Sequence, residues 1–504
     1  MRGQRLSGID AALLRAEHPT NPLTVTGVLM FASPLGFEPL VQTIETRLLH
    51  IDRFHQRAVE DPQEPGHFYW QEEPEIDLDY HLKRTALPEP GDQAALQALV
   101  SHLASTQLEF THPLWQFHLV EHYGSGSALI CRLHHSIADG VALVQVLLSL
   151  TDLQPGDSVA VVEQPQPAGR ETGAPAAGAS AGAGGSRPGI GRRAARGLAQ
   201  WGTPLLLHPR STLRLARTRA ADLLALGTGA AATLGALLLY EPDPKTPLRG
   251  ALTGRKHAVW SAPVPLPEVK LIGRRLGGTV NDVLITALTG ALRRYLLDHG
   301  VVLKDIRLRA IVPVNMRSGE GGQNIGNDLA LVFLPLPMDV ADPVAGLAEV
   351  KRGMDDLKGS LEPLVTKGLF QLLGVVPRPL QDALISFFGS KATALITNVP
   401  GPGEPLYVAG APLDAIMGWA PQTGGVGLGI SILSYAGQVR LGVLVDEEIV
   451  PDPEAIVAGF EAEVETLLAA AAGRPEPTSL KDILANLDRT LETIDSILAQ
   501  GSEQ

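Results

Sequence analysis

The stretch His134-His135-Ser136-Ile137-Ala138-Asp139-Gly140 decides how the rest of the chain is interpreted. It follows a β-favouring apolar run at residues 127–133 and precedes an apolar, helix-like run at residues 141–150. Successive side chains of a strand point to opposite faces, so two adjacent histidines at its end cannot both face one cavity. We therefore expect one histidine to act and the other to support it.

The chemistry available to such a histidine is proton transfer. An imidazole has an unperturbed pKa of about 6.5, so it is largely neutral at pH 7 and accepts the proton of an attacking hydroxyl group. Asp139 lies just before the expected helix, where its carboxylate would cap the helix or fix the turn, and Gly140 would permit a tight passage into the helix. The ordinary alternative is a hydrogen-bonded pair of core histidines. The aspartate and glycine at fixed offsets make that alternative less favoured.

A covalent mechanism is not expected. The single cysteine, Cys131, lies four residues before His135, which is about 13 Å away if the segment is extended at roughly 3.3 Å per residue. That distance excludes a hydrogen bond between the two side chains. The sequence also lacks an H-E-x-x-H zinc helix and a P-loop. We expect direct transfer of a group to a hydroxyl, with no bound metal.

Composition narrows the class of protein. At 504 residues the chain exceeds one ordinary hydrophobic core, so two domains plus accessory segments are expected. The formal net charge of -13 argues against a general nucleic-acid binder, which needs a basic face. One cysteine excludes an internal disulfide and fits a reducing cytoplasm. Residues 1–10 carry charge and no apolar core, so no secretory signal is expected.

Hydrophobic periodicity predicts two α/β domains, at residues 1–154 and 251–475. In the first, strands are expected at 24–32, 116–122 and 127–133, and Leu40, Ile44 and Leu48 mark a helix. In the second, the patterns predict strands at 311–316, 330–336, 394–399, 427–433 and 439–445 and helices at 283–297, 344–357 and 454–471.

The segments between and after the domains differ in composition. Residues 155–191 are rich in Ala, Gly and Pro, which predicts a flexible linker. Residues 192–250 are expected to form a basic and apolar helical connector. Residues 476–504 are expected to form a C-terminal helix with a narrow leucine stripe, which is more typical of a docking helix than of a coiled-coil dimer. The sequence leaves the oligomeric state open.

A membrane or lipid surface is the partner that residues 187–240 indicate. Eight arginines occur between residues 187 and 219 with no acidic residue before Asp222. Residues 223–240 then contain no charge, which is near the lower limit for a membrane-spanning helix. Three glycines lower their helix propensity, so a peripheral or packed segment is favoured over insertion.

A second candidate site lies at Asn281. Thr279-Val280-Asn281-Asp282 precedes the expected helix at 283–297, and an ordinary helix cap with an acidic first turn explains the pattern. The start of a helix also offers free amide donors. An asparagine beside them is able to stabilise an oxyanion.

Together these motifs resemble the bifunctional wax ester synthase/acyl-CoA:diacylglycerol acyltransferases of bacteria, within the coenzyme A-dependent acyltransferase superfamily. The resemblance covers nearly the whole chain, and the motifs occur in the family's order. The motifs are Leu6-Ser7-Gly8-Ile9-Asp10-Ala11, Pro113-Leu114-Trp115, His134 to Gly140, Asn281-Asp282-Val283-Leu284, Val314-Asn315-Met316-Arg317, Asn324-Ile325-Gly326-Asn327, Asn398-Val399-Pro400-Gly401-Pro402 and Ser434-Tyr435-Ala436-Gly437.

The resemblance implies two chloramphenicol-acetyltransferase-like α/β domains, each a mixed sheet with packed helices, and a channel between them. Acyl-CoA would enter as a substrate from one side and a long-chain alcohol or diacylglycerol from the other, with no cofactor. His135 would be the base, with His134, Asp139 and Asn281 at the reaction centre. Further residues would support the site: Gly140, Pro113, Leu114, Trp115 and Asp282. Where the family commonly has Val-Val-Leu-Ala after Asn-Asp, this chain has Val283-Leu284-Ile285-Thr286.

The expected function is thus formation of wax esters, triacylglycerol or both by a cytoplasmic enzyme attached peripherally to the inner membrane or to lipid inclusions. Two alternatives remain. One is an acyltransferase that uses another acceptor or a carrier-bound acyl group. The other is a non-catalytic coat protein of lipid inclusions, against which the intact His134, His135, Asp139 and Asn281 argue.

Overall fold

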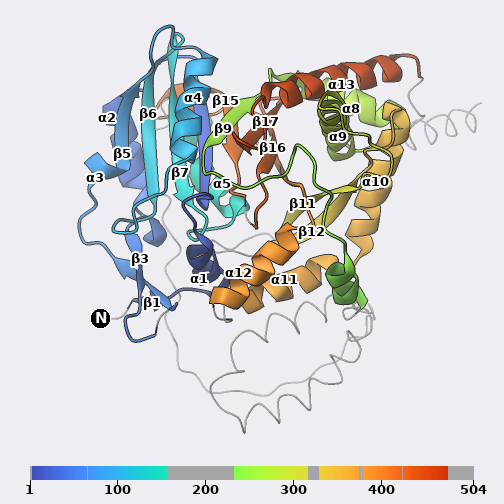
Figure 1. Ribbon diagram of the computed structural model, residues 1–504. Helices are drawn as coiled ribbons and strands as arrows, with labels where there is room; N and C mark the ends of the chain where they lie inside the picture. The colour runs from blue at the N-terminus through green and yellow to red at the C-terminus, as the bar shows by residue number, and fades with distance from the viewer. Residues whose placement is uncertain are drawn as a thin grey trace, which may run out of the picture.

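The computed structural model describes residues 3–64, 66–155, 232–315, 329–373, 376, 378–422 and 424–474. Two seven-stranded mixed sheets, each packed with helices, lie side by side (Figure 1). A smaller three-stranded sheet of β1 (Gln4–Arg5), β4 (Phe68–Glu72) and β3 (Gln56–Glu60) flanks the first. The mixed α/β class expected from the periodicity is confirmed.

The first sheet carries the double histidine. Its strands, in spatial order, are β5 (Leu82–Ala86), β6 (Trp115–Tyr123), β7 (Gly126–His134), β2 (Thr24–Phe31), β15 (Ala411–Trp419), β14 (Tyr407–Val408) and β8 (Thr151–Asp152).

Strand β7 lies near the middle of this sheet. It pairs antiparallel with β2, with Thr24 opposite His134, and antiparallel with β6, with Trp115 opposite Leu133. Every residue of β7 is buried, because separate apolar clusters cover its two faces. A strand buried on both faces has little freedom, so its end is a rigid base for the histidines.

The second sheet is built around parallel pairs. Its strands, in spatial order, are β10 (Val264–Pro265), β17 (Gln438–Asp446), β16 (Leu428–Tyr435), β13 (Ala394–Pro400), β11 (Leu308–Asn315) and β12 (Leu329–Leu336), with β9 (Lys256–Trp260) also on β17. β13 runs parallel to both β16 and β11.

Helices surround both sheets (Figure 1). In the first half they are α1 (Gly8–Ala16), α2 (Phe37–Thr43), which continues as the π-helical turn η1 (Ile44–Leu48), η2 (Asp52–Phe54), α3 (Leu78–His81), α4 (Gln93–Ala104) and α5 (Gly140–Ser149). In the second half they are a helix at residues 232–239, α8 (Leu266–Leu276), α9 (Val280–Asp298), α10 (Pro343–Gly359), α11 (Glu362–Leu373), α12 (Arg378–Gly389) and α13 (Glu454–Ala472).

The sheets do not follow the division of the chain at residue 251. β14 and β15 come from the C-terminal half, yet they complete the first sheet, where β15 pairs with β2 from Thr26 to Phe31. The side chains of β15 alternate between the interior and the surface, with Asp414 exposed. The two halves are therefore interlocked through a hairpin.

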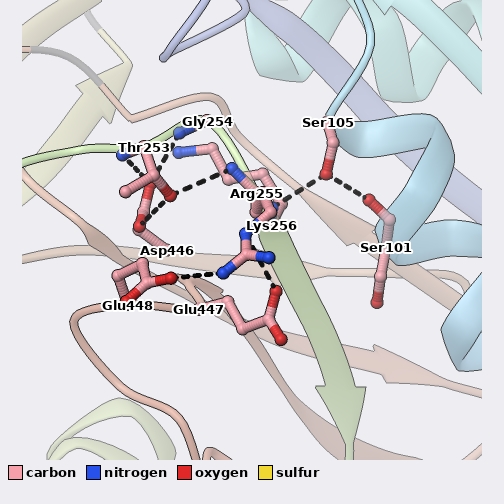
Figure 2. Close-up of polar contacts among 9 residues, drawn as sticks. All are labelled: Ser101, Ser105, Thr253, Gly254, Arg255, Lys256, Asp446, Glu447 and Glu448. Carbon is pink, nitrogen blue, oxygen red and sulfur yellow. Dashed lines mark hydrogen bonds and ion pairs between the residues drawn. The ribbon is translucent and has the colours of Figure 1, made fainter.

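A polar junction also joins the halves (Figure 2). In α4, Ser101 and Ser105 accept hydrogen bonds from the backbone of β9, at 2.9 Å from Ala258 N and 2.8 Å from Lys256 N. Asp446, at the end of β17, accepts hydrogen bonds from the amides of Thr253 and Gly254. The two serines of the first half thus satisfy the edge of β9 that does not pair with β17, and Asp446 holds the segment that leads into β9.

Several expectations concern residues outside the described ranges. They are most of the linker and connector at residues 156–231, the motif at Asn324 to Asn327, and the C-terminal helix from residue 475 on. Of the uncharged run, residues 232–240 are described, and residues 232–239 form a helix that exposes Leu234, Leu238 and Leu239. Within the described part of the chain, no helix combines the length and apolar character needed to cross a bilayer.

Candidate active site

The two histidines lie where β7 ends. His134 is its last residue and is fully buried, whereas His135 begins the following turn and is half-buried. The amide of His134 donates to Leu114 O at 2.9 Å, and the amide of His135 donates to Leu23 O at 2.9 Å. The neighbouring residues thus differ in exposure, as the strand alternation predicts, and each has its backbone fixed by a different segment.

The ring of His134 is held on both edges. Its Nδ1 accepts the Ser136 amide at 3.1 Å and lies 2.8 Å from the Ser136 hydroxyl oxygen. Because Nδ1 accepts, the proton of the neutral ring belongs on Nε2. Nε2 lies 3.4 Å from Oε2 of Glu17, a distance typical of an ion-pair contact rather than a good hydrogen bond.

Glu17 is a site residue that the sequence did not reveal. Its side chain, only 5% exposed, accepts hydrogen bonds from the Leu23 amide at 2.5 Å and from Gln107 Nε2 at 3.0 Å. Burial alone would raise the pKa of this carboxyl, but His134 and these two donors together lower it below its ordinary value. Glu17 is therefore a buried carboxylate in the ionised form at neutral pH. No periodicity or spacing distinguishes it among the 54 acidic residues.

Asp139 caps α5, as the sequence predicts. Its Oδ1 accepts the Ala142 amide at 2.9 Å, and its backbone is extended. The expectation for Gly140 needs correction. Its φ is not positive, and a Cβ added there would meet no atom within 4 Å, so neither the backbone nor the packing demands glycine. The space beside Gly140 is open.

Pro113-Leu114-Trp115 supports the histidine strand directly. All three side chains are buried, and Leu114 O holds the His134 amide. The Trp115 indole donates to Phe54 O at 2.8 Å, and the ring of His81 stacks on it with centroids 4.2 Å apart. This motif is part of the core in this structure, and through Leu114 it also fixes the position of the histidine pair.

Asn281 and Asp282 begin α9. Asp282 forms a reciprocal capping box with Thr279, at 2.8 and 3.2 Å, which confirms the predicted helix cap. Asn281 is half-buried, and its Oδ1 accepts a hydrogen bond from Asn398 Nδ2 at 2.6 Å. Because Asn281 Oδ1 is bound to Asn398, the side-chain N–H groups of Asn281 point away from Asn398. Asn398 belongs to one of the motifs that carry the family resemblance, but no role was predicted for it.

Motifs of the second half are connected to the histidine segment through a strand pair and a shared apolar cluster. Asn398 pairs with Ile432 in the parallel β13–β16 ladder. At the end of β16, Leu433 and Tyr435 belong to the same buried apolar cluster as Ile137 and Ala138. Tyr435 also accepts the Leu406 amide and donates to Leu413 O in β15. The strand that pairs with Asn398 therefore shares an apolar cluster with the turn that carries His135.

Cys131 lies inside the core, with no exposed surface. Burial raises the pKa of its thiol above the ordinary value, so the nucleophilic thiolate is disfavoured. It lies on the extended strand β7, which ends one residue before His135.

An apolar pocket lies between the two halves of the molecule. It encloses about 740 Å³ of empty space when the solvent at its open mouth is included. Almost all of its lining is apolar. Helix α1 supplies Ile9, Leu13 and Ala16, and the remaining walls come from β11, β12, α11 and α12. Ala16 directly precedes Glu17, so one wall of the pocket continues into the residue that contacts His134.

Comparisons with known proteins identify the family of this chain. Residues 6–284 match the wax ester synthase/diacylglycerol acyltransferase catalytic domain, and residues 325–468 match the corresponding C-terminal domain. Two candidate diacylglycerol O-acyltransferases of Mycobacterium tuberculosis are similar to the chain. One is 30% identical over 95% of this chain and 93% of its own length, and the other is 26% identical over 93% and 96%.

Solved structures show the same fold. A wax ester synthase/diacylglycerol acyltransferase from Marinobacter aquaeolei superimposes with a TM-score of 0.64 at 23% identity, covering 93% of this chain and all of that one. The first condensation domain of the calcium-dependent antibiotic synthetase gives 0.56 at 15% identity, covering 94% and 97%. With catalytic and C-terminal domain matches that include the histidine motif, the chain belongs to the wax ester synthase/diacylglycerol acyltransferase family and is an acyl-CoA-dependent acyltransferase.

Proposed function

We propose that the chain transfers the acyl group of a long-chain acyl-CoA to the hydroxyl group of a long-chain alcohol or diacylglycerol, with His135 as the general base. The observation that carries the proposal is the half-buried His135 at the end of a fully buried strand, beside a buried histidine whose ring is fixed on both edges. A base that is held in place and still accessible is what hydroxyl activation requires.

The reaction then follows from proton transfer at His135. The imidazole takes the hydroxyl proton as the oxygen attacks the thioester carbon, which gives a tetrahedral oxyanion. The carbon–sulfur bond then breaks, the new ester leaves, and the imidazolium returns its proton to the thiolate of CoA. N–H donors at the start of α9, with Asn281 oriented by Asn398, are proposed to stabilise the oxyanion. CoA is a substrate here, and the balanced reaction requires neither a metal nor a further cofactor.

The apolar pocket supports a lipid substrate. Burial of a methylene group contributes about 0.8 kcal/mol, so a hydrocarbon chain would be stabilised by contact with this almost wholly apolar lining. Because Ala16 lines the pocket and Glu17 contacts His134, a chain in the pocket would bring its polar end toward the histidines.

Attachment to a lipid surface is the proposed way in which such substrates reach the enzyme. The described end of the connector exposes Leu234, Leu238 and Leu239, with Leu239 83% exposed. The arginines of residues 187–219 precede this helix in the chain. Basic side chains that precede exposed leucines in the chain favour reversible, peripheral binding to an anionic membrane or to a lipid inclusion on the cytoplasmic side.

Purified protein incubated with palmitoyl-CoA and a panel of alcohols, with thiol release followed and products separated, tests the proposal. Long-chain alcohols or diacylglycerol should give an ester and one equivalent of CoA. Turnover only with polar acceptors or with a carrier-bound acyl group would replace the proposed substrates. Binding to lipid inclusions without any turnover would leave the coat-protein alternative.

A further inference from the structure

The surroundings of Glu17 carry an inference about how the catalytic histidine is positioned. Glu17 follows directly after α1 and its side chain is buried against β7. Oε2 accepts the Leu23 amide at 2.5 Å, and the carbonyl of the same Leu23 accepts the His135 amide at 2.9 Å. A continuous path of two hydrogen bonds therefore connects the carboxylate with the backbone of His135.

The same carboxylate also contacts the other histidine. Oε2 lies 3.4 Å from Nε2 of His134, the ring edge opposite the one held by Ser136. His134 is thus confined between Ser136 and Glu17, and its backbone continues into His135. One oxygen atom contacts both segments that fix the catalytic residue.

We infer that Glu17 is a positioning residue for the acyl transfer, holding His135 in place through Leu23 on one side and through the ring of His134 on the other. The inference rests on the proposed role of His135 as the base. Glu17 itself has no part in proton transfer to the substrate in this account. Gln107, which donates to Oε1 at 3.0 Å, restricts rotation of the carboxylate and completes the arrangement.

The electrostatic consequence is a fixed negative charge close to the histidine pair. The titratable or charged groups that face it are His134 and Arg132, both from β7, and the attraction of Glu17 favours the charged form of Arg132. A nearby carboxylate also favours the protonated form of an imidazole. Removing the charge while keeping the shape should therefore lower the apparent pKa of the catalytic histidine, which a merely structural role would not do.

The test compares Glu17→Gln and Glu17→Ala in the full-length protein with Glu60→Gln as a matched control. Glu60 also accepts a backbone amide six residues further along the chain, from Gly66 at 2.7 Å, but it lies on β3. A misplaced catalytic group lowers the rate by up to about 100-fold, so Glu17→Ala should lower kcat to that extent with KM for acyl-CoA little changed. Glu17→Gln keeps an oxygen acceptor, so its loss should be smaller, with the acidic limb of the pH–rate profile moved to lower pH.

Parallel measurement of His135→Ala distinguishes a failure of the proposed base from a failure of the positioning role of Glu17. If His135→Ala retains activity, the proposed base is wrong, whatever Glu17 does. If His135→Ala is inactive while both Glu17 variants keep wild-type kcat and pH profile, the positioning role is refuted. A folded Glu17→Gln protein that loses affinity for acyl-CoA and keeps kcat would also refute it. Should Glu17→Ala fail to fold, Glu17→Gln, which is isosteric, decides the question.

Discussion

His134 and His135 are adjacent in the chain but have different surroundings. One ring is fully buried between Ser136 and Glu17, and the other begins an accessible turn. Strand alternation was sufficient to predict that the two would differ. It was not sufficient to find Glu17, because that contact joins residues more than a hundred positions apart, and no local pattern encodes it.

Two other histidines make the first sheet sensitive to acid. Burial, with Arg132 and Lys83 nearby, lowers the pKa of His118 to about 4, and burial lowers the pKa of His81 to about 4 as well. The pKa in the unfolded chain is about 6.5. Between these values the unfolded state binds more protons than the folded state, so the free energy of unfolding must fall as the pH drops from about 6.5 to 4.

His118→Gln should weaken this acid sensitivity. At pH 4.5 a single histidine with these values contributes on the order of 2 kcal/mol to the acid-induced loss. Urea unfolding at pH 7 and pH 4.5 should therefore show a smaller loss of unfolding free energy in the variant than in the wild type. The exposed His50→Gln serves as the control. An identical loss in all three proteins would show that His118 is not held neutral by the fold.

Helix α1 both lines the apolar pocket and positions Glu17. Ile9, Leu13 and Ala16 line the apolar pocket, and the chain that leaves the helix places Glu17 at His134. Its sequence motif, Leu6 to Ala11, was one of those that indicated the family, but the pocket also depends on strands and helices almost 300 residues or more away along the chain. Contacts between elements so far apart in the sequence leave no pattern in the residues around α1.

Ala16→Phe should shift the preference of the enzyme toward substrates with a shorter hydrocarbon chain. The larger side chain fills part of the pocket, and each methylene group that loses its contact costs about 0.8 kcal/mol, or about 4-fold in kcat/KM. Competition between C8 and C16 acyl-CoAs, and then between C8 and C16 alcohols, measures the shift and identifies which substrate chain occupies the pocket. Ala383→Phe, on the exposed side of α12, should leave both ratios unchanged. Unchanged ratios for Ala16→Phe as well would exclude the pocket from substrate binding.

The strands of the core were predictable because their apolar runs are long, and β2, β6, β7, β11, β12, β13, β16 and β17 lie where the periodicity places them. β15 was not recognised. Its alternating side chains are typical of a strand with one exposed face, but its partner β2 belongs to the opposite end of the chain. The order of strands in a sheet is set by tertiary packing, which periodicity does not report.

Three features of the molecule suit an enzyme that takes its substrates from a lipid phase. They are the two interlocked sheets, the apolar pocket between α1 and the second sheet with α11 and α12, and the basic connector that bears exposed leucines. Each arginine near an anionic surface contributes about 1 kcal/mol, and salt screens this attraction over about 10 Å at 0.1 M.

Replacement of the eight arginines from Arg187 to Arg219 with Gln should therefore weaken binding to anionic vesicles. In a flotation assay the wild type should bind at low salt and be largely released at high salt. The variant should also lose activity on dispersed long-chain alcohols while keeping activity on short soluble ones. Wild-type protein that is released only by detergent would indicate insertion of residues 223–240, and protein that never binds vesicles would contradict the lipid-surface proposal.

The most direct test of the central claim is thiol release by His135→Ala and His134→Ala with palmitoyl-CoA and a long-chain alcohol. General-base assistance is worth about 100- to 10,000-fold, so His135→Ala should lower the rate by that factor while its unfolding transition stays close to that of the wild type. His134→Ala should lose less activity, because His134 acts through the position of its neighbour. A His135→Ala protein that keeps most of its activity, or a His134→Ala protein that is the inactive one of the pair, would contradict the assignment of His135 as the base.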